Sequence, residues 1–223
     1  MNDRESKKEK VFVYGASGHA KVVIDIIEKQ KQYNIAFLVD DDETLKGKEI
    51  FGHKVLGGKR ELLEACEVFP SPKGLVAIGV NTIRLDIGDW LGSEGLHFIS
   101  AIHPSAQIAR GVTVSDGTVI MAHAVVNPDS KIGEHAIINT AAIVDHDCIV
   151  GDGVHIAPGA TLCGGVTVGS GTFIGAGATI VQNIAIGNNV TVGAGSTVVN
   201  DIPDGVTVTG TPAKPYPSKN SPA

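Results

Sequence analysis

The 223-residue chain is poor in cysteine, in aromatic residues and in long apolar runs. Its three cysteines, Cys66, Cys148 and Cys163, are odd in number and show no CxxC spacing, which argues against a disulfide framework or a thiolate metal site. No stretch provides the roughly 20 apolar residues of a membrane span, and the charged start MNDRESKKEK lacks the apolar region of a signal peptide. We therefore expect a protein of the reducing cytoplasm with no membrane partner.

Charge also excludes classes of partner. With 43% hydrophobic residues, 19% charged residues and a formal net charge of −6, the chain has neither the composition of a disordered protein nor the basic surface that coats nucleic acid. Residues 1–100 carry 14 Lys and Arg and 16 Asp and Glu, whereas residues 101–203 carry only Arg110 and Lys131 against seven acids. The sequence therefore predicts two domains of different construction, which we place at 11–100 and 101–214, with tails at 1–10 and 215–223.

The first domain alternates strand-like and helix-like segments. Apolar runs predict strands over 11–14, 35–40 and 75–80, and apolar residues at helical spacing predict helices over 21–32, 61–66 and 82–91. This alternation is typical of a small Rossmann-like α/β domain with a parallel sheet.

The second domain is a repeat of six residues. Stepping by six from Ile102 to Val198 meets 17 consecutive aliphatic residues, and four places after each of them comes a small or β-branched residue or a close substitute. A period of six fits neither a helix nor a plain strand, so each hexad must be a short strand and a bend with the aliphatic residue inward. The pattern predicts a parallel β-helix built almost without aromatic residues.

One segment of the repeat, residues 141–160, concentrates groups that can do chemistry. His146 lies between Asp145 and Asp147, and a neighbouring carboxylate can orient an imidazole and raise its basicity, as a general base requires. We interpret Cys148, at the inward small-residue position of its hexad, as core packing, and His103, His123 and His135 as solvated outward-facing histidines.

In the first domain, three segments converge on one edge of the predicted sheet. The turn GASGHA follows the first strand and opens a helix, although its Gly15-x-x-Gly18 spacing is not the dinucleotide fingerprint GxGxxG. Asp40 and Asp41 follow the second strand, and IGVNTIR (78–84) follows the third. Ligands of such folds bind at this edge, so we expect a binding site there.

The hexads, the segment INTAAIVDHDCIVGDGVHIAPGA and the ending GTPAK (210–214) resemble the hexapeptide-repeat acyltransferases. Within that family, residues 11–214 are similar to the sialic acid O-acetyltransferase and bacillosamine-type nucleotide-sugar N-acetyltransferase subfamily. The resemblance implies a left-handed β-helix with three hexads in each 18-residue coil, and hence between five and six coils. It also implies a homotrimer with active sites between subunits.

The resemblance assigns roles to particular residues. His146 is implied as the catalytic base and Asp147, where some relatives carry Glu, as the acid that increases its basicity. His155 lies half a coil from His146, so the two are expected on different faces of one subunit and can converge only across a subunit boundary. The implied acetyl-CoA contacts are His155, Ala176 and Ala194. The implied contacts of the nucleotide-linked sugar are Ser17, Gly18, His19, Asp40, Asp41, Gly79, Asn81 and Arg84. The resemblance implies no metal.

We therefore predict an acetyl-CoA-dependent N-acetyltransferase that acts on the amino group of a nucleotide-linked 4-amino-4,6-dideoxy sugar for bacterial surface-glycan biosynthesis. Acetylation of a hydroxyl of sialic acid or of another sugar is the alternative within the same class. Two other classes are a zinc enzyme like the γ-type carbonic anhydrases, using His135, His146 and His155, and a nucleotide-sugar sensor or scaffold without catalysis.

Overall fold

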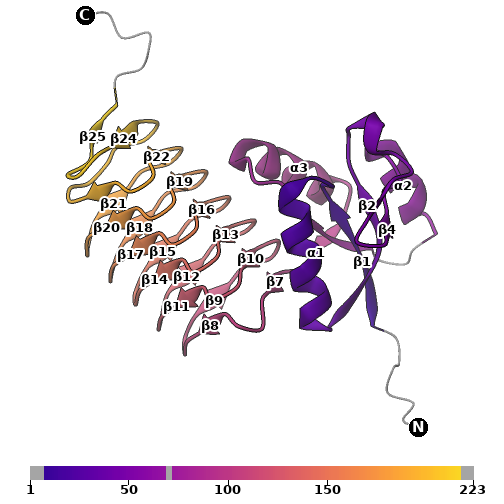
Figure 1. The fold of residues 1–223 in the computed structure, drawn as a ribbon, viewed down its shortest axis with the longest axis horizontal. Coiled ribbons are helices and arrows are strands. Elements are labelled where there is room, and N and C mark those ends of the chain that lie inside the picture. The colour runs from indigo at the N-terminus through magenta and orange to yellow at the C-terminus, as the bar shows by residue number, and fades with distance from the viewer. Residues whose placement is uncertain (1–7, 69–71, 217–223) are drawn as a thin grey trace, which may run out of the picture. The chain divides into compact units, whose positions relative to one another are not determined.

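Figure 1 shows the computed structural model of the chain, which describes residues 8–68 and 72–216. The chain divides into two units, Met1–Pro104 and Ser105–Ala223, so the boundary falls four residues beyond the predicted one. Of the two predicted tails, residues 1–7 and 217–223 lie outside the described residues. No helix in the described ranges is long and apolar enough to cross a membrane.

The first unit is a parallel sheet with helices, as predicted. Its four-stranded sheet has the order β2-β1-β5-β6, and every neighbouring pair in it is parallel. The elements are β1 (Glu9–Tyr14), α1 (Gly18–Gln30), β2 (Tyr33–Val39), the 3-10 helix η1 (Glu43–Leu45), β3 (Glu49–Ile50), β4 (His53–Lys54), α2 (Lys59–Cys66), β5 (Lys73–Val76), α3 (Asn81–Ser93), β6 (His97–Phe98) and β7 (Ala101–Ile102).

The sequence prediction missed the shortest strands of this unit. β6 and the antiparallel pair β3 and β4 have two residues each, which is too short to show the alternation that marks a strand. The aromatic residues that are scarce in the second unit are concentrated here: Phe12 and Tyr14 of β1 are buried in one cluster with Leu62 of α2 and Leu91 of α3. This packing holds α2 and α3 against one face of the sheet.

The order of the strands creates a reversal at the carboxyl end of β1. The chain passes from β1 to β2 on one side and later reaches β5 on the other side. The Gly15 N–H donates to the Val39 carbonyl at 2.7 Å, and the Ala77 N–H donates to the Tyr14 carbonyl at 2.7 Å. The segments after β1, β2 and β5 therefore lie side by side at this edge, as the sequence predicted.

The second unit is a parallel β-helix with three faces and a corner after each strand (Figure 1). The first face holds β10 (Val119–Ile120), β13 (Ile137–Ile138), β16 (His155–Ile156), β19 (Phe173–Ile174), β22 (Thr191–Val192), β24 (Thr207–Thr209) and β25 (Lys214–Pro215). The second face holds β8 (Gln107–Ile108), β11 (Val125–Val126), β14 (Ile143–Val144), β17 (Thr161–Leu162), β20 (Thr179–Ile180) and β23 (Thr197–Val198). The third face holds β9 (Thr113–Val114), β12 (Lys131–Ile132), β15 (Ile149–Val150), β18 (Thr167–Val168) and β21 (Ala185–Ile186).

The six-residue phase continues without interruption from β8 to β23, and each coil pairs with the next at a step of 18 residues, as Val119 pairs with Ile137. From Ile120 to Val198 every inward aliphatic residue is at most 2% exposed. Ile108 is 38% exposed because it belongs to the first coil of the unit, where no earlier coil covers it. Since the phase does not slip, no loop leaves these coils to enclose a substrate.

Candidate active site

The corner between the second and third faces, which we call the catalytic corner, carries His146 between β14 and β15. The third residue of this corner has a positive φ in five successive coils, with Gly111 at 78°, Asp129 at 62°, Asp147 at 59°, Gly165 at 70° and Asn183 at 60°. Gly, Asp and Asn are the residues that adopt this left-handed conformation at least cost. The corner geometry therefore favours Asp at 147 over the longer Glu of some relatives.

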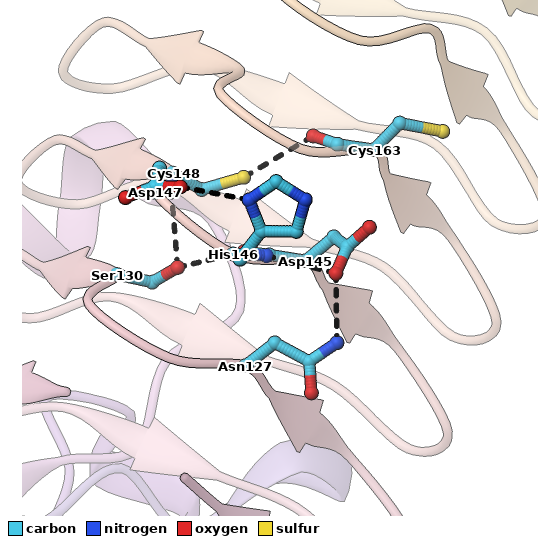
Figure 2. A network of polar contacts seen from close by, with 7 residues as sticks. All are labelled: Asn127, Ser130, Asp145, His146, Asp147, Cys148 and Cys163. Carbon is cyan, nitrogen blue, oxygen red and sulfur yellow. Dashed lines mark hydrogen bonds and ion pairs between the residues drawn. The ribbon is translucent and has the colours of Figure 1, made fainter. Parts of the chain in front are cut away.

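Asp147 and His146 form the contact that the sequence predicted. His146 Nδ1 lies 2.8 Å from Asp147 Oδ2, and both side chains are more than half exposed (Figure 2). Because an ionised carboxylate can only accept, Nδ1 carries the proton in this contact. The other ring nitrogen, Nε2, then presents a lone pair and can accept a proton from a substrate.

Asp145 supports the same histidine from its other side. Its Oδ1 accepts the backbone N–H of His146 at 2.8 Å and the side-chain amide of Asn127 at 2.8 Å (Figure 2). Ser130 Oγ donates to the Asp145 carbonyl at 2.7 Å and accepts the Cys148 N–H at 3.1 Å, which joins consecutive coils. Asp145 is thus fixed both through its carboxylate and through its backbone carbonyl.

These contacts set the protonation of the corner. The hydrogen bond with Asp147, followed by the charge of Asp145, raises the pKa of His146 above its ordinary value. The hydrogen bonds from Asn127 and from the His146 backbone lower the pKa of Asp145. Because a raised pKa makes an imidazole a stronger base, the arrangement suits proton abstraction near neutral pH.

Gly164 leaves room for the imidazole one coil further along. A Cβ atom at this position would lie 2.6 Å from Cε1 and Nε2 of His146, so only glycine allows the ring to rest there. A pocket of about 400 Å³ opens beside the ring and is lined by Asp145, His146, Asp147, Cys163, Gly164, Gly165, Gln182 and Asn183. The sequence prediction missed Asn127 and Gln182, although steps of 18 residues from Asp145 and His146 lead to both, and it considered Gly164 with Gly165 only as open backbone for the pantetheine arm of the coenzyme.

The three predicted coenzyme contacts lie away from His146 within one chain. His155 is in β16 on the first face, opposite the catalytic corner, and Ala176 and Ala194 are exposed at the corner between the first and second faces. His155 is 8% exposed, its Nε2 lies 3.0 Å from Asn139 Nδ2, and its ring meets Phe173 edge-on at 5.2 Å. One chain therefore does not bring these residues to the base.

The remaining predictions for the β-helix have mixed outcomes. Cys148 is fully buried, and its thiol donates to the Cys163 carbonyl at 3.3 Å, as expected of a core residue. The interpretation of His135 as solvated is wrong, because this side chain is only 5% exposed. The ring lies beneath Gly117 of the preceding coil, where the missing side chain leaves space for it.

Within the described ranges no three His, Cys, Asp or Glu side chains form a group that could hold a metal ion.

In the first unit, the acids after β2 organise the predicted binding edge. Both oxygens of Asp40 accept backbone N–H groups, from Ala16 at 2.7 Å and from Asp42 at 2.9 Å. Asp41 accepts the hydroxyl of Tyr14 at 2.7 Å, and burial followed by this hydrogen bond raises the pKa of Tyr14. The acids therefore fix the turn after β1.

The turn after β1 has one glycine that the backbone needs and one that it does not. Gly15 has a φ of 115°, and a Cβ there would lie 2.7 Å from the Ala77 carbonyl oxygen. Gly18 opens α1 without a positive φ, and a Cβ there would meet no atom within 4 Å. Ser17 precedes the helix without capping it through its side chain. A pocket of about 460 Å³ adjoins the turn, lined by Ala16, Ser17, Gly18, Lys21, Leu45, Glu49, Ile50 and Phe51.

Arg84 is buried beneath the edge, where it holds the loop after β5. It is 0% exposed and donates to the carbonyls of Ile78 at 2.9 Å and Gly79 at 3.2 Å and to Asn81 Oδ1 at 2.9 Å. Asn81 is 9% exposed, whereas a Cβ at Gly79 would meet no atom within 4 Å. Burial, followed by the charge of Arg84, lowers the pKa of His19 to about 4, so His19 is neutral at pH 7. Among these residues, Gly79 is the one whose backbone a ligand can approach, and the buried Arg84 side chain holds that backbone through the Gly79 carbonyl.

Comparison with known proteins identifies both units. Residues 10–91 match the model of the PglD N-terminal domain, and residues 129–164 and 165–200 match the bacterial transferase hexapeptide (six repeats). The fold and the corner histidine thus define a left-handed β-helix transferase of the hexapeptide-repeat class, preceded by a PglD-type domain.

Solved structures narrow the class to a family. The perosamine N-acetyltransferase from Caulobacter crescentus, in complex with CoA and GDP-perosamine, is 39% identical, with a TM-score of 0.89 over 95% of this chain and 99% of that chain. The acetyltransferase domain of PglB from Neisseria gonorrhoeae, in complex with acetyl coenzyme A, is 38% identical, with a TM-score of 0.85 over 94% of this chain and all of that chain. The chain belongs to this family of hexapeptide-repeat nucleotide-sugar N-acetyltransferases.

A curated relative extends the similarity to a second sugar. The UDP-N-acetylbacillosamine N-acetyltransferase of Bacillus subtilis is 38% identical over 114 residues, which cover 50% of this chain and 51% of that protein. The match thus spans about half the length of that enzyme. The Caulobacter and Bacillus relatives are thus named for different sugars, perosamine and UDP-N-acetylbacillosamine.

Proposed function

We propose that the protein transfers the acetyl group of acetyl-CoA to the amino group of a nucleotide-linked 4-amino-4,6-dideoxy sugar. The observation that carries the proposal is the exposed His146 imidazole, which contacts Asp147 through Nδ1 at 2.8 Å and has Nε2 beside the open backbone of Gly164. The family supports the acceptor class, because its perosamine member has been solved with CoA and GDP-perosamine.

In this mechanism the amine nitrogen attacks the thioester carbonyl carbon and His146 Nε2 takes the proton that the nitrogen loses. The new C–N bond forms, the C–S bond breaks, and the leaving thiolate of the coenzyme takes the proton from the His146 imidazolium, which restores the neutral base. Asp147 keeps Nδ1 protonated and stabilises the imidazolium that forms. Gly164 lines the pocket beside the base, and in this proposal a backbone N–H such as its own donates to the oxyanion that develops on the thioester carbonyl.

The first unit supplies the binding energy for the nucleotide in this proposal. The N-terminus of α1 at Ser17 and Gly18 and the side chain of Lys21 border the same pocket, and both features favour a diphosphate. Asp40 and Asp41 hold the turn in place. Gly79 lets the ligand approach the backbone, Asn81 and Arg84 support that loop, and the neutral His19 remains a predicted contact of the nucleotide sugar. Homotrimeric assembly and a cytoplasmic location remain predictions.

The test is mass spectrometry of reactions with acetyl-CoA and a panel of UDP-, GDP- and dTDP-linked 4-amino-4,6-dideoxy sugars, with 4-hydroxy counterparts as controls. We expect one amino sugar to gain a single acetyl group. Reaction of a hydroxyl compound alone, such as sialic acid, would favour the O-acetyltransferase alternative. Retained nucleotide binding without any acetyl transfer would favour the sensor.

His146→Ala is the matched test of the mechanism. We expect it to remove most turnover and to leave coenzyme binding intact, which isothermal titration with CoA measures. Unchanged turnover would eliminate His146 as the base.

A further inference from the structure

Asn127 has no role in the proposed chemistry, yet it lies one coil before Asp145 at the same corner of the β-helix. Its Nδ2 donates to Asp145 Oδ1 at 2.8 Å, and the same oxygen accepts the backbone N–H of His146 at 2.8 Å. Among residues 8–68 and 72–216, no other side chain donates to the Asp145 carboxylate. Two donors thus converge on one oxygen, one of them from the base's own backbone (Figure 2).

We propose that Asn127 is a positioning residue for the His146 base and that it acts through the Asp145 carboxylate. The inference rests on the proposed function, in which His146 is the base. Asn127 reaches neither the imidazole nor the lining of the 400 Å³ pocket, whereas Asp145 lines it. Any effect of Asn127 on the reaction must therefore pass through Asp145.

The bond does two things for the corner. It fixes the rotamer of a short, partly exposed carboxylate that water would otherwise solvate in several orientations. A hydrogen bond to the charged form also keeps that carboxylate ionised into the acid range, in agreement with the lowered pKa of Asp145. The His146 ring therefore meets a negative charge at a constant place.

Among the charged groups around His146, Asp145 and Asp147 are the ones in direct contact with its backbone or ring, and they dominate the electrostatics of the imidazole. Asp129 lies at the same corner one coil earlier, and the Cys163 thiol lines the pocket one coil later. The basic residues of 101–203 are Arg110, at this corner two coils earlier, and Lys131, on the third face. Gln182 and Asn183, which complete the lining, carry no charge.

The repeat itself indicates that Asn127 can be replaced without unfolding the chain. Positions equivalent to 127 in other coils hold Ala109, Cys163, Val181 and Val199, so the fold tolerates small apolar residues there. Asn127→Ala restores the residue found one coil earlier. Asn188→Ala is the matched control, because Asn188 Nδ2 donates to Asp204 Oδ2 at 3.2 Å in a similar Asn and Asp pair at another corner.

The first measurement is an NMR titration of the His146 imidazole in the full chain with labelled histidine, assigned with His146→Ala. In Asn127→Ala we expect the titration midpoint to move to lower pH, because a less constrained carboxylate stabilises the imidazolium less. In Asn188→Ala we expect no change. An unchanged midpoint in Asn127→Ala would overturn the proposal.

The second measurement is a double-mutant cycle on kcat/KM over pH. Asn127→Ala is expected to lower the plateau about threefold to tenfold and to move the acidic limb to lower pH. In an Asp145→Asn background the same substitution should have no further effect, whereas an equal effect there would exclude the route through Asp145. If the NMR midpoint moves but the limb stays in place, His146 is not the base and the proposed function's mechanism fails, while the effect of Asn127 on the imidazole stands.

Discussion

At the scale of single residues, the chemistry depends on one histidine between two aspartates that act differently. Asp147 contacts the ring through Nδ1, whereas Asp145 accepts the backbone N–H of His146 and acts on the ring by its charge. The side chain of His146 is 59% exposed, so salt and water screen both effects until a substrate covers the ring. The raised pKa of His146 therefore comes from hydrogen bonding in the first place.

The pH dependence of Asp147→Asn tests the contact with the ring. The base acts when it is neutral, so kcat/KM falls as pH drops through the His146 pKa, and the raised pKa places this fall at higher pH. Removing the carboxylate lowers that pKa, so the acidic limb should move to lower pH and the plateau should fall roughly tenfold. Asp129→Asn, with the same left-handed backbone one coil earlier, is the control and should retain the wild-type profile. Identical profiles for both variants would contradict the assignment.

Gly164→Ala tests whether the ring needs the space above it. The new Cβ would lie 2.6 Å from Cε1 and Nε2, so the exposed ring must turn away from its contact with Asp147. We expect kcat to fall by about 10- to 100-fold, because misplacing a base by a fraction of an ångström removes its alignment. The melting temperature should change by less than about 2 °C, since this corner carries Pro128 and Gln182 in other coils. Full activity in a folded variant would refute the steric argument.

At the scale of elements, the turn between β1 and α1 separates what the fold needs from what a ligand needs. Gly15 has a left-handed φ of 115° against the Ala77 carbonyl, whereas Gly18 has open space and an ordinary backbone. Since the fold does not require glycine at position 18, we expect a ligand to approach the backbone there.

Two alanine substitutions separate these roles. Gly15→Ala should destabilise the protein by about 2–3 kcal/mol, measured by chemical denaturation, because both φ and the contact with Ala77 oppose a Cβ. Gly18→Ala should leave stability unchanged or slightly higher and raise KM for the nucleotide sugar about fivefold or more, with KM for acetyl-CoA unaffected. An unchanged acceptor KM in Gly18→Ala would move the nucleotide away from this turn.

At the scale of the whole molecule, a single chain separates the residues that the predicted site needs together. His146 lies at the catalytic corner and His155 on the opposite face, and the strand ladders of the coils hold both in place. A site that uses both therefore requires a second copy of the chain, in agreement with the predicted trimer.

Mixing inactive subunits tests this directly. His146→Ala and His155→Ala, each impaired alone, should regain activity when they are co-expressed, because some interfaces then pair an intact His146 with an intact His155 of a neighbour. Random assembly of a cyclic trimer makes such interfaces about a quarter of the total. Activity no greater than that of the separate variants would indicate that each active site uses His146 and His155 of the same chain.

Much of the architecture could be predicted because it follows from local patterns. The six-residue phase from Ile102 to Val198 predicts a parallel β-helix, and alternating apolar strands and helices predict the sheet of the first unit. His146 with its flanking acids was visible for the same reason, since all three are adjacent in the chain. The two-residue strands β3, β4 and β6 were not visible, because two residues carry no period.

Contacts between residues far apart in the sequence were decided only by the tertiary structure. Stacking of coils at 18-residue steps brings Gly164 over His146, Asn127 to Asp145 and Gly117 over His135, which buries a histidine that the sequence left in solvent. Packing in the first unit likewise buries Arg84 beneath the loop that it was predicted to share with a ligand. The sequence by itself determines which residue faces inward in each hexad, because that depends on neighbours in the chain. Which side chains meet, and with what charge and proton, depends on how the coils and strands stack, because only stacking sets distances between residues a coil or more apart.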